Sequence, residues 1–389
     1  MDKLLVLTSI ITAFFYGVCV TSFIIGWFKT SKKTVAQVET YPDVSVIIAA
    51  RNEEKFIGTL LGELLQQDYP AEKMEIIVVD DFSQDCTPDI IKEFINCGNG
   101  RRVCYLPNAS IKDKGKKGAL KNGIEKARGE VVITIDADCR AGTNWVSSMV
   151  NAFIKHNARM IIGPVRIMAK NTIFSQLQAL EFSSLTASSA GALGLGYPIM
   201  CNGANLAFCR KTYHELKEKL QGKKHLSGDD VFLMLAIHMK YPGSIGFAKD
   251  HHAIVDTYAA GNLESFLNQR MRWTSKSTGY KEAAPLVVGA IVASINLLLI
   301  VLLAFTLPGN GLIGKSLLCL WVFKFIVDFP LLYLESRFMN NSQLLRYYPL
   351  LQLIYPFYVS ITLLLAFLVP FTWKDRSQKK GKRYFSCIH

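Results

Sequence analysis

Paired cysteines are missing from this sequence. Its nine cysteines are spread singly over 389 residues, and no two of them form a CxxC pair. Zinc ribbons and small disulfide-linked domains both need closely spaced cysteines, so the sequence argues against either class. Scattered unpaired thiols are typical of a reducing compartment.

Nucleic-acid-binding motifs are also missing, although the formal net charge is +13. We find no basic helix, zinc finger or aromatic-basic RNA motif, so nucleic acid is not expected as a partner. Part of the positive charge instead flanks apolar segments, at Lys29, Lys32 and Lys33 and from Lys374 to Arg383. We attribute the excess mainly to membrane flanks, with a share left for a polyanionic ligand.

Charge is scarce at the amino-terminal end. Leu4–Trp27 has no charged residue over 24 positions, enough for a helix to cross about 30 Å of hydrocarbon. A cleaved signal peptide is the competing interpretation, but the run is longer than a typical signal core and lacks a small-residue cleavage site. We predict a membrane anchor over residues 1–30. The lysines that follow it predict that residue 30 onward lies in the cytoplasm, against the inner face of the cell membrane.

Membrane composition returns in residues 283–372. We predict spans over Ala283–Leu307 and Leu312–Leu334, while Tyr347–Thr372 is a third uncharged stretch, interrupted by prolines. A third crossing would put the basic tail, residues 373–389, outside the cell, against the rule that positive loops stay inside. Either the proline-bearing segment is a re-entrant or interfacial hairpin, or the tail breaks the rule. The protein is therefore expected to be multi-pass, with two to three spans after its middle domain.

One ion pair is expected inside the second of these spans. Lys324 and Asp328 lie four residues apart and hence on one face of a helix. Pairing would lessen the cost of each charge inside a membrane.

The middle of the chain, residues 43–275, has ordinary globular composition and predicts an α/β domain. Short apolar strands alternate with amphipathic helices, which predicts a mostly parallel sheet with helices on both faces. The predicted strands are Val44–Ala49, Glu75–Val79, Val103–Leu106, Val131–Ile135 and Met160–Ile162. The predicted helices are Glu53–Gln67, Pro88–Asn96, Lys117–Arg128 and Trp145–His156. Residues 166–282 are expected to be less regular, with a Ser/Ala/Gly-rich stretch at Ser183–Gly196.

Acidic clusters follow three of the predicted strands. They contain Glu53, then Asp80 and Asp81, then Asp136 and Asp138. Ligands bind at the carboxyl ends of strands in such sheets, so these side chains are expected to converge. Two carboxylates two residues apart, as in Asp136-Ala137-Asp138, can both reach one Mg²⁺ or Mn²⁺ ion that also binds phosphate oxygens. Alone, this pattern is more often a solvated turn.

Three further segments contain candidate site residues. Gly115 and Lys116 precede a predicted helix, where backbone amides and ammonium groups favour anions, although a flexible basic loop is equally compatible. Asp229 and Asp230 offer a general base, since adjacent carboxylates raise one pKa, but helix starts favour Asp in any case. Gln269-Arg270-Met271-Arg272-Trp273 combines guanidinium groups for a diphosphate with an aromatic plane for a sugar or base. An interfacial helix is the alternative for that segment.

Taken in order, these segments resemble the membrane-bound family 2 glycosyltransferases, which are related to cellulose, chitin, hyaluronan and poly-N-acetylglucosamine synthases. The matching pieces are VSVIIAARNEE (44–54), IIVVDDFSQD (76–85), GKKGALKNG (115–123), DAD (136–138), CNGANLAF (201–208), GDD (228–230) and QRMRW (269–273).

The resemblance implies a GT-A fold, Rossmann-like, together with transmembrane helices. It implies an inverting, metal-dependent enzyme that uses a nucleotide-diphosphate sugar, with UDP as carrier, and a lipid or glycan acceptor. By motif, Glu53, Asp80, Asp81, Lys116 and Asp136 bind the donor, Asp138 contacts the donor and the divalent cation, and Asp230 is the catalytic base. The part of the site that contacts the acceptor and the diphosphate is assigned, again by motif, to Gly203, Asn205, Asp229, Gln269, Arg272 and Trp273.

The sequence departs from the family pattern in three places. Ala50-Arg51 replaces Pro-x-Tyr, Gly-Asp-Asp replaces Thr-Glu-Asp, and no gating loop of the cellulose synthase type follows Trp273.

The small membrane region favours transfer of one or a few sugars, whereas QRMRW favours a processive polysaccharide synthase. Outside this chemistry, the alternatives are a nucleotidyltransferase, which needs a Gly-rich loop that Ala49–Asn52 does not provide, and a non-catalytic membrane protein.

Overall fold

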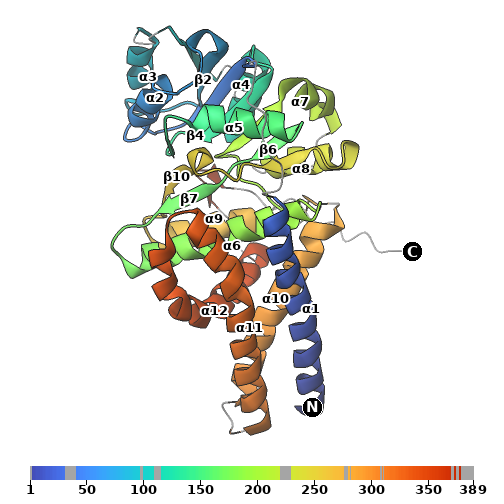
Figure 1. The fold of residues 1–389 in the computed structure, drawn as a ribbon. Coiled ribbons are helices and arrows are strands. Elements are labelled where there is room, and N and C mark those ends of the chain that lie inside the picture. The colour runs from blue at the N-terminus through green and yellow to red at the C-terminus, as the bar shows by residue number, and fades with distance from the viewer. Residues whose placement is uncertain are drawn as a thin grey trace, which may run out of the picture.

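The computed structural model describes residues 2–30, 41–96, 100–108, 115–219, 229–275, 279–280, 282–306, 309, 311–368, 372–373 and 376–377. An α/β domain stands above a group of long helices, and the two are joined through α6 (Ile173–Gly194), α9 (Leu263–Ser275) and α1 (Asp2–Lys29) (Figure 1).

A seven-stranded sheet forms the centre of the α/β domain, in the order β3-β2-β1-β4-β8-β6-β9. Its strands are β1 (Val44–Ala50), β2 (Met74–Asp80), β3 (Arg102–Pro107), β4 (Val131–Asp136), β6 (Met160–Ile162), β8 (Leu206–Cys209) and β9 (Ile245–Phe247). Four of the six neighbouring pairs are parallel, and β8 runs antiparallel to β4 and β6. The prediction of a mostly parallel sheet is confirmed, and all five predicted strands are present.

Helices cover both faces of this sheet because successive strand residues point to opposite sides. In β1, Val46 and Ile48 join the core beneath the helices α2, α3 and α5, while Ile47 joins the core beneath α4. Both sets are buried, as expected for a sheet covered on both faces. The bounds are α2 (Ile57–Leu65), α3 (Thr87–Asn96), α4 (Lys116–Lys126) and α5 (Trp145–Lys155).

The expectation of less regular structure in residues 166–282 is wrong. The segment contains α6, α7 (Arg210–Leu216), α8 (Asp229–Lys240), α9, most of one strand, three further strands and short 3-10 turns. It also completes a second sheet, β5-β10-β7, made of β5 (Arg140–Ala141), β7 (Val165–Met168) and β10 (Val255–Tyr258). Helix α6 has apolar and small residues around its whole circumference, so it lacks the amphipathic period that identifies a helix at the surface.

Small residues let α6 pack directly on α1. A Cβ built at Gly26 would lie 1.8 Å from the Gly191 carbonyl oxygen, and one at Gly194 would lie 2.0 Å from the Gly26 carbonyl oxygen. Only glycine permits backbones to approach so closely. The Ser/Ala/Gly-rich stretch is therefore a helix–helix contact between the amino-terminal segment and the α/β domain.

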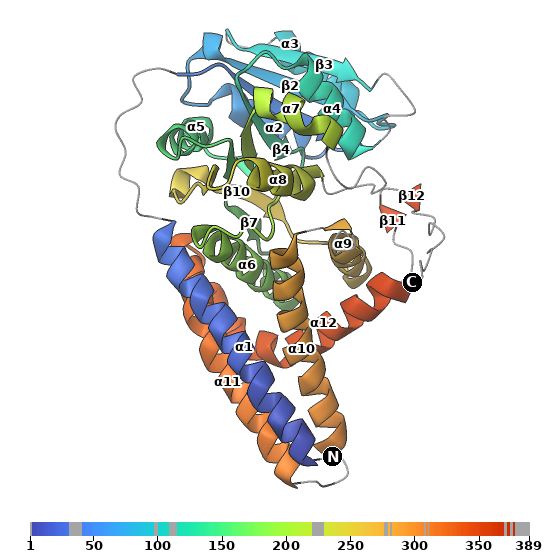
Figure 2. The ribbon, with the colours of Figure 1, turned by 90° about the vertical axis from the view of Figure 1, so that its right-hand side faces the viewer.

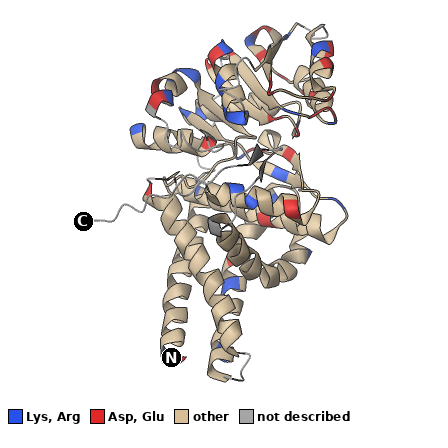
Figure 3. Ribbon diagram, turned by 180° about the vertical axis from the view of Figure 1, so that it is seen from behind, with Lys and Arg blue, Asp and Glu red and all other residues tan. Residues whose placement is uncertain are grey.

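Among the described residues, four helices are long and apolar enough to cross a membrane. They are α1, α10 (Ala283–Thr306), α11 (Gly311–Phe338) and the segment Ser342–Ala366. Charged residues are concentrated in the α/β domain, whereas the long helices carry few (Figure 3). Figure 2 shows α1, α10 and α11 side by side, with α12 (Tyr348–Leu368) oblique to them and directed toward α9.

The proline-bearing segment is one helix, with Pro356 inside it, and the hairpin alternative for this segment is wrong. Most of the tail at 373–389 lies outside the described residues. What is described of the tail region is a short pairing of β11 (Thr372–Trp373) with β12 (Arg376–Ser377).

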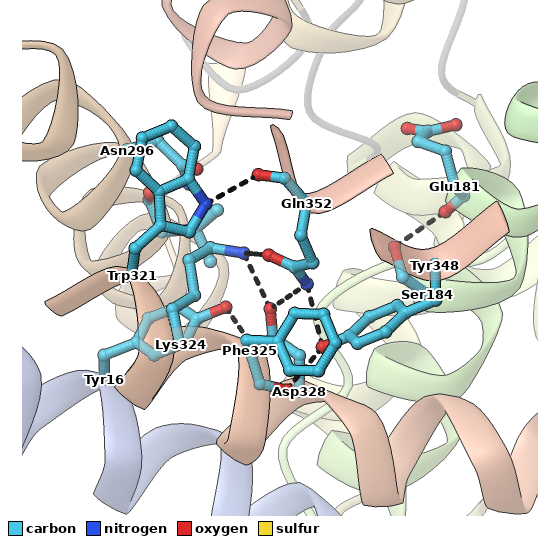
Figure 4. A network of polar contacts seen from close by, with 11 residues as sticks. Tyr16, Glu181, Ser184, Asn296, Trp321, Lys324, Phe325, Asp328, Tyr348 and Gln352 are labelled. Carbon is cyan, nitrogen blue, oxygen red and sulfur yellow. Dashed lines mark hydrogen bonds and ion pairs between the residues drawn. The ribbon is translucent and has the colours of Figure 1, made fainter. Parts of the chain in front are cut away.

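The predicted ion pair in α11 is confirmed, and it belongs to a wider network (Figure 4). Lys324 Nζ lies 2.7 Å from Asp328 Oδ2 and donates to Gln352 Oε1 of α12 at 2.9 Å. Asp328 also accepts from Tyr16 of α1, O···O 2.7 Å, and from Gln352 Nε2 at 3.0 Å. The Lys324 side chain is 1% exposed. The network therefore ties α1, α11 and α12 together.

Removing one charge of this pair is expected to destabilise the membrane region. Asp328→Asn leaves the Lys324 ammonium buried without a carboxylate, and breaking such a buried pair costs about 3 kcal/mol. We expect a clearly lower melting temperature in detergent. The double variant Lys324→Gln with Asp328→Asn removes both charges and should recover most of the loss. Equal melting temperatures for wild type and Asp328→Asn would show that the pair contributes no stability.

Candidate active site

A cavity of about 220 Å³ lies where β1, β2 and β4 end. Predicted site residues from distant parts of the chain line it: Glu53, Asp81, Lys116, Asp136, Asp138, Asp230, Gln269, Arg272 and Trp273. Asp80, Gly203 and Asn205 are not among its lining residues, and the side chain of Asp229 lies outside the described part of the structure. The convergence expected from the sheet topology is thus present.

Two strained residues shape the end of the cavity next to β1 and β2. Asn52 has a φ of 53° and Phe82 a φ of 60°, a conformation that costs free energy for residues other than glycine. Contacts between the two turns offset this cost, since Asn52 N donates to Ser83 Oγ at 3.0 Å and Gln84 N donates to Asn52 Oδ1 at 2.9 Å. The Arg51 guanidinium donates to the Asp81 carbonyl oxygen at 2.9 Å. The two strand ends therefore form one rigid edge.

Asp81 connects this edge to the loop before α4. Its Oδ1 accepts from Gly115 N at 2.8 Å and from Asn108 Nδ2 at 3.0 Å. Gly115 has a φ of 113°, which a side chain would disfavour. Asp80 is buried, and its carboxylate accepts from Ser83 N at 3.3 Å. Asp80 thus supports the turn, while Asp81 positions the start of α4.

Lys116, at the start of α4, forms an ion pair with Asp136 at the end of β4. Burial lowers the pKa of the Lys116 ammonium, but the charge of Asp136 and the hydrogen bond to it outweigh burial, so the pKa is raised overall. Both side chains are 30% exposed. A fixed cation therefore faces the cavity beside a carboxylate.

Asp138 follows β4 by two residues and also lines the cavity. The described residues hold no group of three or more His, Cys, Asp or Glu side chains arranged as a metal cage. Mg²⁺ and Mn²⁺ are usually bound through one or two carboxylates, with phosphate and water oxygens completing the shell. The oxygen ligands here fit that kind of site rather than an all-protein cage. The neighbouring Cys139 is buried, and burial together with the two nearby aspartates raises the pKa of its thiol.

Asp230 lies in the first turn of α8 and borders the cavity. Its Oδ2 accepts from Gly203 N at 3.0 Å, and its Oδ1 accepts from Val231 N at 2.9 Å. A Cβ built at Gly203 would lie 3.3 Å from Asp230 Oδ2, tighter than most such contacts. The backbone of Gly203 therefore packs against the Asp230 carboxylate and holds its orientation.

The QRMRW segment forms part of α9, and its side chains point either into the cavity or into the protein interior. Gln269, Arg272 and Trp273 line the cavity. Burial lowers the pKa of the Arg272 guanidinium, while the charges of Asp136 and Asp230 act in the opposite direction. Arg270 points away into an ion pair with Glu181 of α6, where both side chains are almost fully buried. Its guanidinium carbon lies 4.3 Å from the centroid of the Trp273 ring, which fixes that ring.

Asn205 is fully buried and connects the start of α5, the segment between β6 and β7, and the 3-10 turn before β10. Its Oδ1 accepts from Trp145 Nε1 at 3.0 Å, and its Nδ2 donates to the Pro164 and Ala253 carbonyl oxygens at 2.7 and 2.8 Å. Its amide is thus engaged inside the domain, while Asn202 and Ala204 of the same motif line the cavity.

Sequence reasoning did not select several lining residues, among them Asn202, Phe182, Thr257 and Tyr258. Asn202 lies within the CNGANLAF motif, so the motif itself was a usable signal. Thr257 and Tyr258 end β10 in a sheet that was not predicted, and no local pattern marks them.

Two family models match the chain. "Glycosyl transferase family 2" matches residues 45–216, and "Glycosyl transferase family group 2" matches residues 131–374, more than half of the chain.

Curated relatives match over about a third of their own length. A beta-monoglucosyldiacylglycerol synthase of Trichormus variabilis is 29% identical over 147 residues, 36% of this chain and 30% of that protein. A poly-beta-1,6-N-acetyl-D-glucosamine synthase of Staphylococcus epidermidis is 31% identical over 144 residues, 36% of this chain and 33% of that protein.

Among solved structures, the mannosyltransferase PcManGT from Pyrobaculum calidifontis, in complex with GDP-Man and Mn²⁺, aligns over 95% of this chain and 99% of that one. The TM-score is 0.55 and the sequence identity 17%. This similarity confirms the GT-A fold.

Proposed function

The chain belongs to glycosyl transferase family group 2, and from this premise we propose that it transfers a sugar from a nucleotide-diphosphate sugar to a hydroxyl group of a membrane-associated acceptor. The observation that supports this proposal most strongly is that one cavity is lined by Asp81, Asp138, Arg272 and Asp230 together. Members of a different class, the nucleotidyltransferases, would need a glycine-rich loop after β1, where this chain has Ala50-Arg51-Asn52.

The donor is proposed to lie along the ends of β1, β2 and β4. Glu53 and Asp81 face the nucleoside, while the Lys116 ammonium and the Arg272 guanidinium face the diphosphate. Cationic donors of this kind form strong charge-assisted hydrogen bonds to phosphate oxygens. UDP is the proposed carrier.

Asp138 is the proposed protein ligand of a Mg²⁺ or Mn²⁺ ion, which when bound would neutralise charge on the diphosphate. The Mn²⁺ in the complex of the mannosyltransferase neighbour supports a divalent cation as the cofactor. Asp136 remains paired with Lys116 and is proposed to contact the donor.

Asp230 is the proposed general base. It takes the proton of the acceptor hydroxyl while the hydroxyl oxygen attacks the anomeric carbon and the bond from that carbon to the diphosphate oxygen breaks. A single displacement inverts the anomeric configuration and needs no covalent nucleophile. The two backbone amides that hold Asp230 keep its carboxylate oriented, and Arg272 stabilises the leaving diphosphate.

The cavity is proposed to face the cytoplasm, with residues 1–30 as an anchor, 43–275 as the catalytic domain and 283–372 as the membrane region. Lys29 at the end of α1, on the side of the α/β domain, supports this orientation. The oblique path of α12 toward α9 supports an interfacial position for this helix (Figure 2). The tail, with six Lys or Arg and one Asp between Lys374 and Arg383, would then stay on the cytoplasmic side.

A donor panel tests the proposed function. Full-length enzyme in detergent, supplied with Mn²⁺ and membrane lipid extract, should release nucleotide diphosphate from one sugar donor and give a product heavier by one or a few sugars. A ladder of longer products would favour the processive alternative, which the poly-N-acetylglucosamine synthase relative supports. Absence of nucleotide release with every donor would refute the transferase proposal.

A further inference from the structure

A second, larger cavity adjoins the candidate active site on the membrane side. Its volume is about 610 Å³, and it lies between α1, α6, α10, α11 and α12. The two cavities share Phe182, Asn202, Asp230 and Trp273. The candidate base therefore borders both the donor cleft and a space among the membrane helices.

Small and apolar side chains create this space. On α6, the stretch rich in small residues contributes Ser184, Ala187 and Ser188, and on α10 the wall includes Gly289 and Ala293. A Cβ at Gly289 would meet no atom within 4 Å, so the wall is open there. Most other lining residues are aliphatic or aromatic. Such a mainly apolar wall suits hydrocarbon better than it suits the many hydroxyl groups of a glycan.

The charges that line the described part of this cavity are almost all paired with one another. Arg270 pairs with Glu181, and Lys324 pairs with Asp328. The fifth charged residue of the lining is Asp230, whose carboxylate accepts hydrogen bonds from Gly203 N and Val231 N at the border with the donor cleft. A lipid phosphate entering here would meet two cations that are already neutralised and one carboxylate, which disfavours a second anion.

We propose that this cavity binds the hydrocarbon chains of an acceptor lipid whose headgroup is an uncharged alcohol, with its hydroxyl group at Asp230. The proposal rests on the proposed function and narrows its acceptor to one chemical class. The hydroxyl proton passes to Asp230, the oxygen bonds to the anomeric carbon, and the nucleotide diphosphate leaves. The named relative that glucosylates a diacylglycerol is compatible with this class.

An acceptor panel tests the class. Full-length enzyme would receive its best donor together with vesicles containing diacylglycerol, vesicles containing a polyprenyl phosphate, or a soluble oligosaccharide. We expect kcat/KM for diacylglycerol to exceed that for the other two by at least about tenfold. Equal or preferred use of the polyprenyl phosphate or the oligosaccharide would overturn the proposal.

A cavity-filling variant tests the location. Gly289→Phe places a ring in the open part of the wall and should raise KM for diacylglycerol about tenfold, with the Kd of the nucleotide unchanged. Val287→Phe is the matched control, because Val287 is 53% exposed on the same helix and does not line the cavity. An unchanged KM in Gly289→Phe would place the lipid elsewhere. Nucleotide binding by the wild-type enzyme distinguishes failure of the acceptor proposal from failure of the proposed function. If the enzyme binds the nucleotide but does not use diacylglycerol, the proposed acceptor class is wrong. If the enzyme does not bind the nucleotide, the proposed function fails as well.

Discussion

An Asp230→Asn variant is expected to lose about a thousandfold or more in kcat while it binds the nucleotide with nearly unchanged affinity. Asn has the size of Asp, but it cannot accept a proton near neutral pH, and loss of a general base typically costs 10²–10⁴-fold, so about 10³ is the central expectation. The amide can still accept one of the two backbone hydrogen bonds, from Gly203 N or Val231 N. Single-turnover transfer and titration calorimetry with the nucleotide diphosphate measure the two quantities.

Asp89→Asn is the matched control for this variant. Asp89 lies on α3, its side chain is 77% exposed, and it is paired with Lys92 outside the cavity. The control should retain the wild-type kcat. If Asp230→Asn also retained it, Asp230 could not be the base, and another group bordering the acceptor would have to take the proton.

Asp138→Ala is expected to abolish the part of donor affinity that depends on Mn²⁺. The variant removes the carboxylate proposed to hold the ion, and loss of a protein ligand from a site with one or two carboxylates leaves too few oxygens for tight binding. We expect the ratio of nucleotide affinities with and without Mn²⁺, measured by calorimetry, to fall to about one, since the diphosphate is then bound by the cations of Lys116 and Arg272 and not by the metal ion.

Asp136→Ala separates metal binding from direct donor binding. This variant frees Lys116 from its ion pair, so nucleotide affinity should change whether or not Mn²⁺ is present. An Asp138→Ala enzyme that kept the wild-type response to Mn²⁺ would remove Asp138 as the metal ligand and would direct attention to Asp136.

The first half of the α/β domain was predictable because its elements obey local rules. The strands β1, β2 and β4 are continuous apolar runs, and each ends in polar residues, so both the parallel sheet and the edge that carries Asp81 and Asp138 follow from pattern alone. The ion pair of Lys324 and Asp328 was likewise predictable from its spacing, since four residues bring two side chains to one face of a helix.

The second half was not predictable because tertiary contacts decide it. Strand β8 is four residues long and pairs antiparallel on both sides, and helix α6 is buried nearly all round, so neither has a clear period. Whether α12 crosses or lies along the membrane depends on its packing against α9, which hydropathy does not encode.

In the candidate site, too, some features were predictable from the sequence and others depend on tertiary packing. Motif residues could be assigned to the cavity, but the difference between Arg272, which lines it, and Arg270, which is paired inside the protein, is set by the rotation of α9 against α6. Asn205 is a similar case: its neighbours Asn202 and Ala204 line the cavity, while its own amide is engaged in the core. Sequence motifs therefore located the site, and packing assigned the individual side chains.

An experimental structure with a nucleotide diphosphate and Mn²⁺ tests the central claim most directly, because that claim is the convergence of donor, cation and base in one cavity. The account predicts an anomalous manganese peak next to Asp138, a diphosphate between this ion and Arg272, and the Asp230 carboxylate on the side that opens toward the membrane helices. A nucleotide or manganese peak bound away from these residues would contradict it.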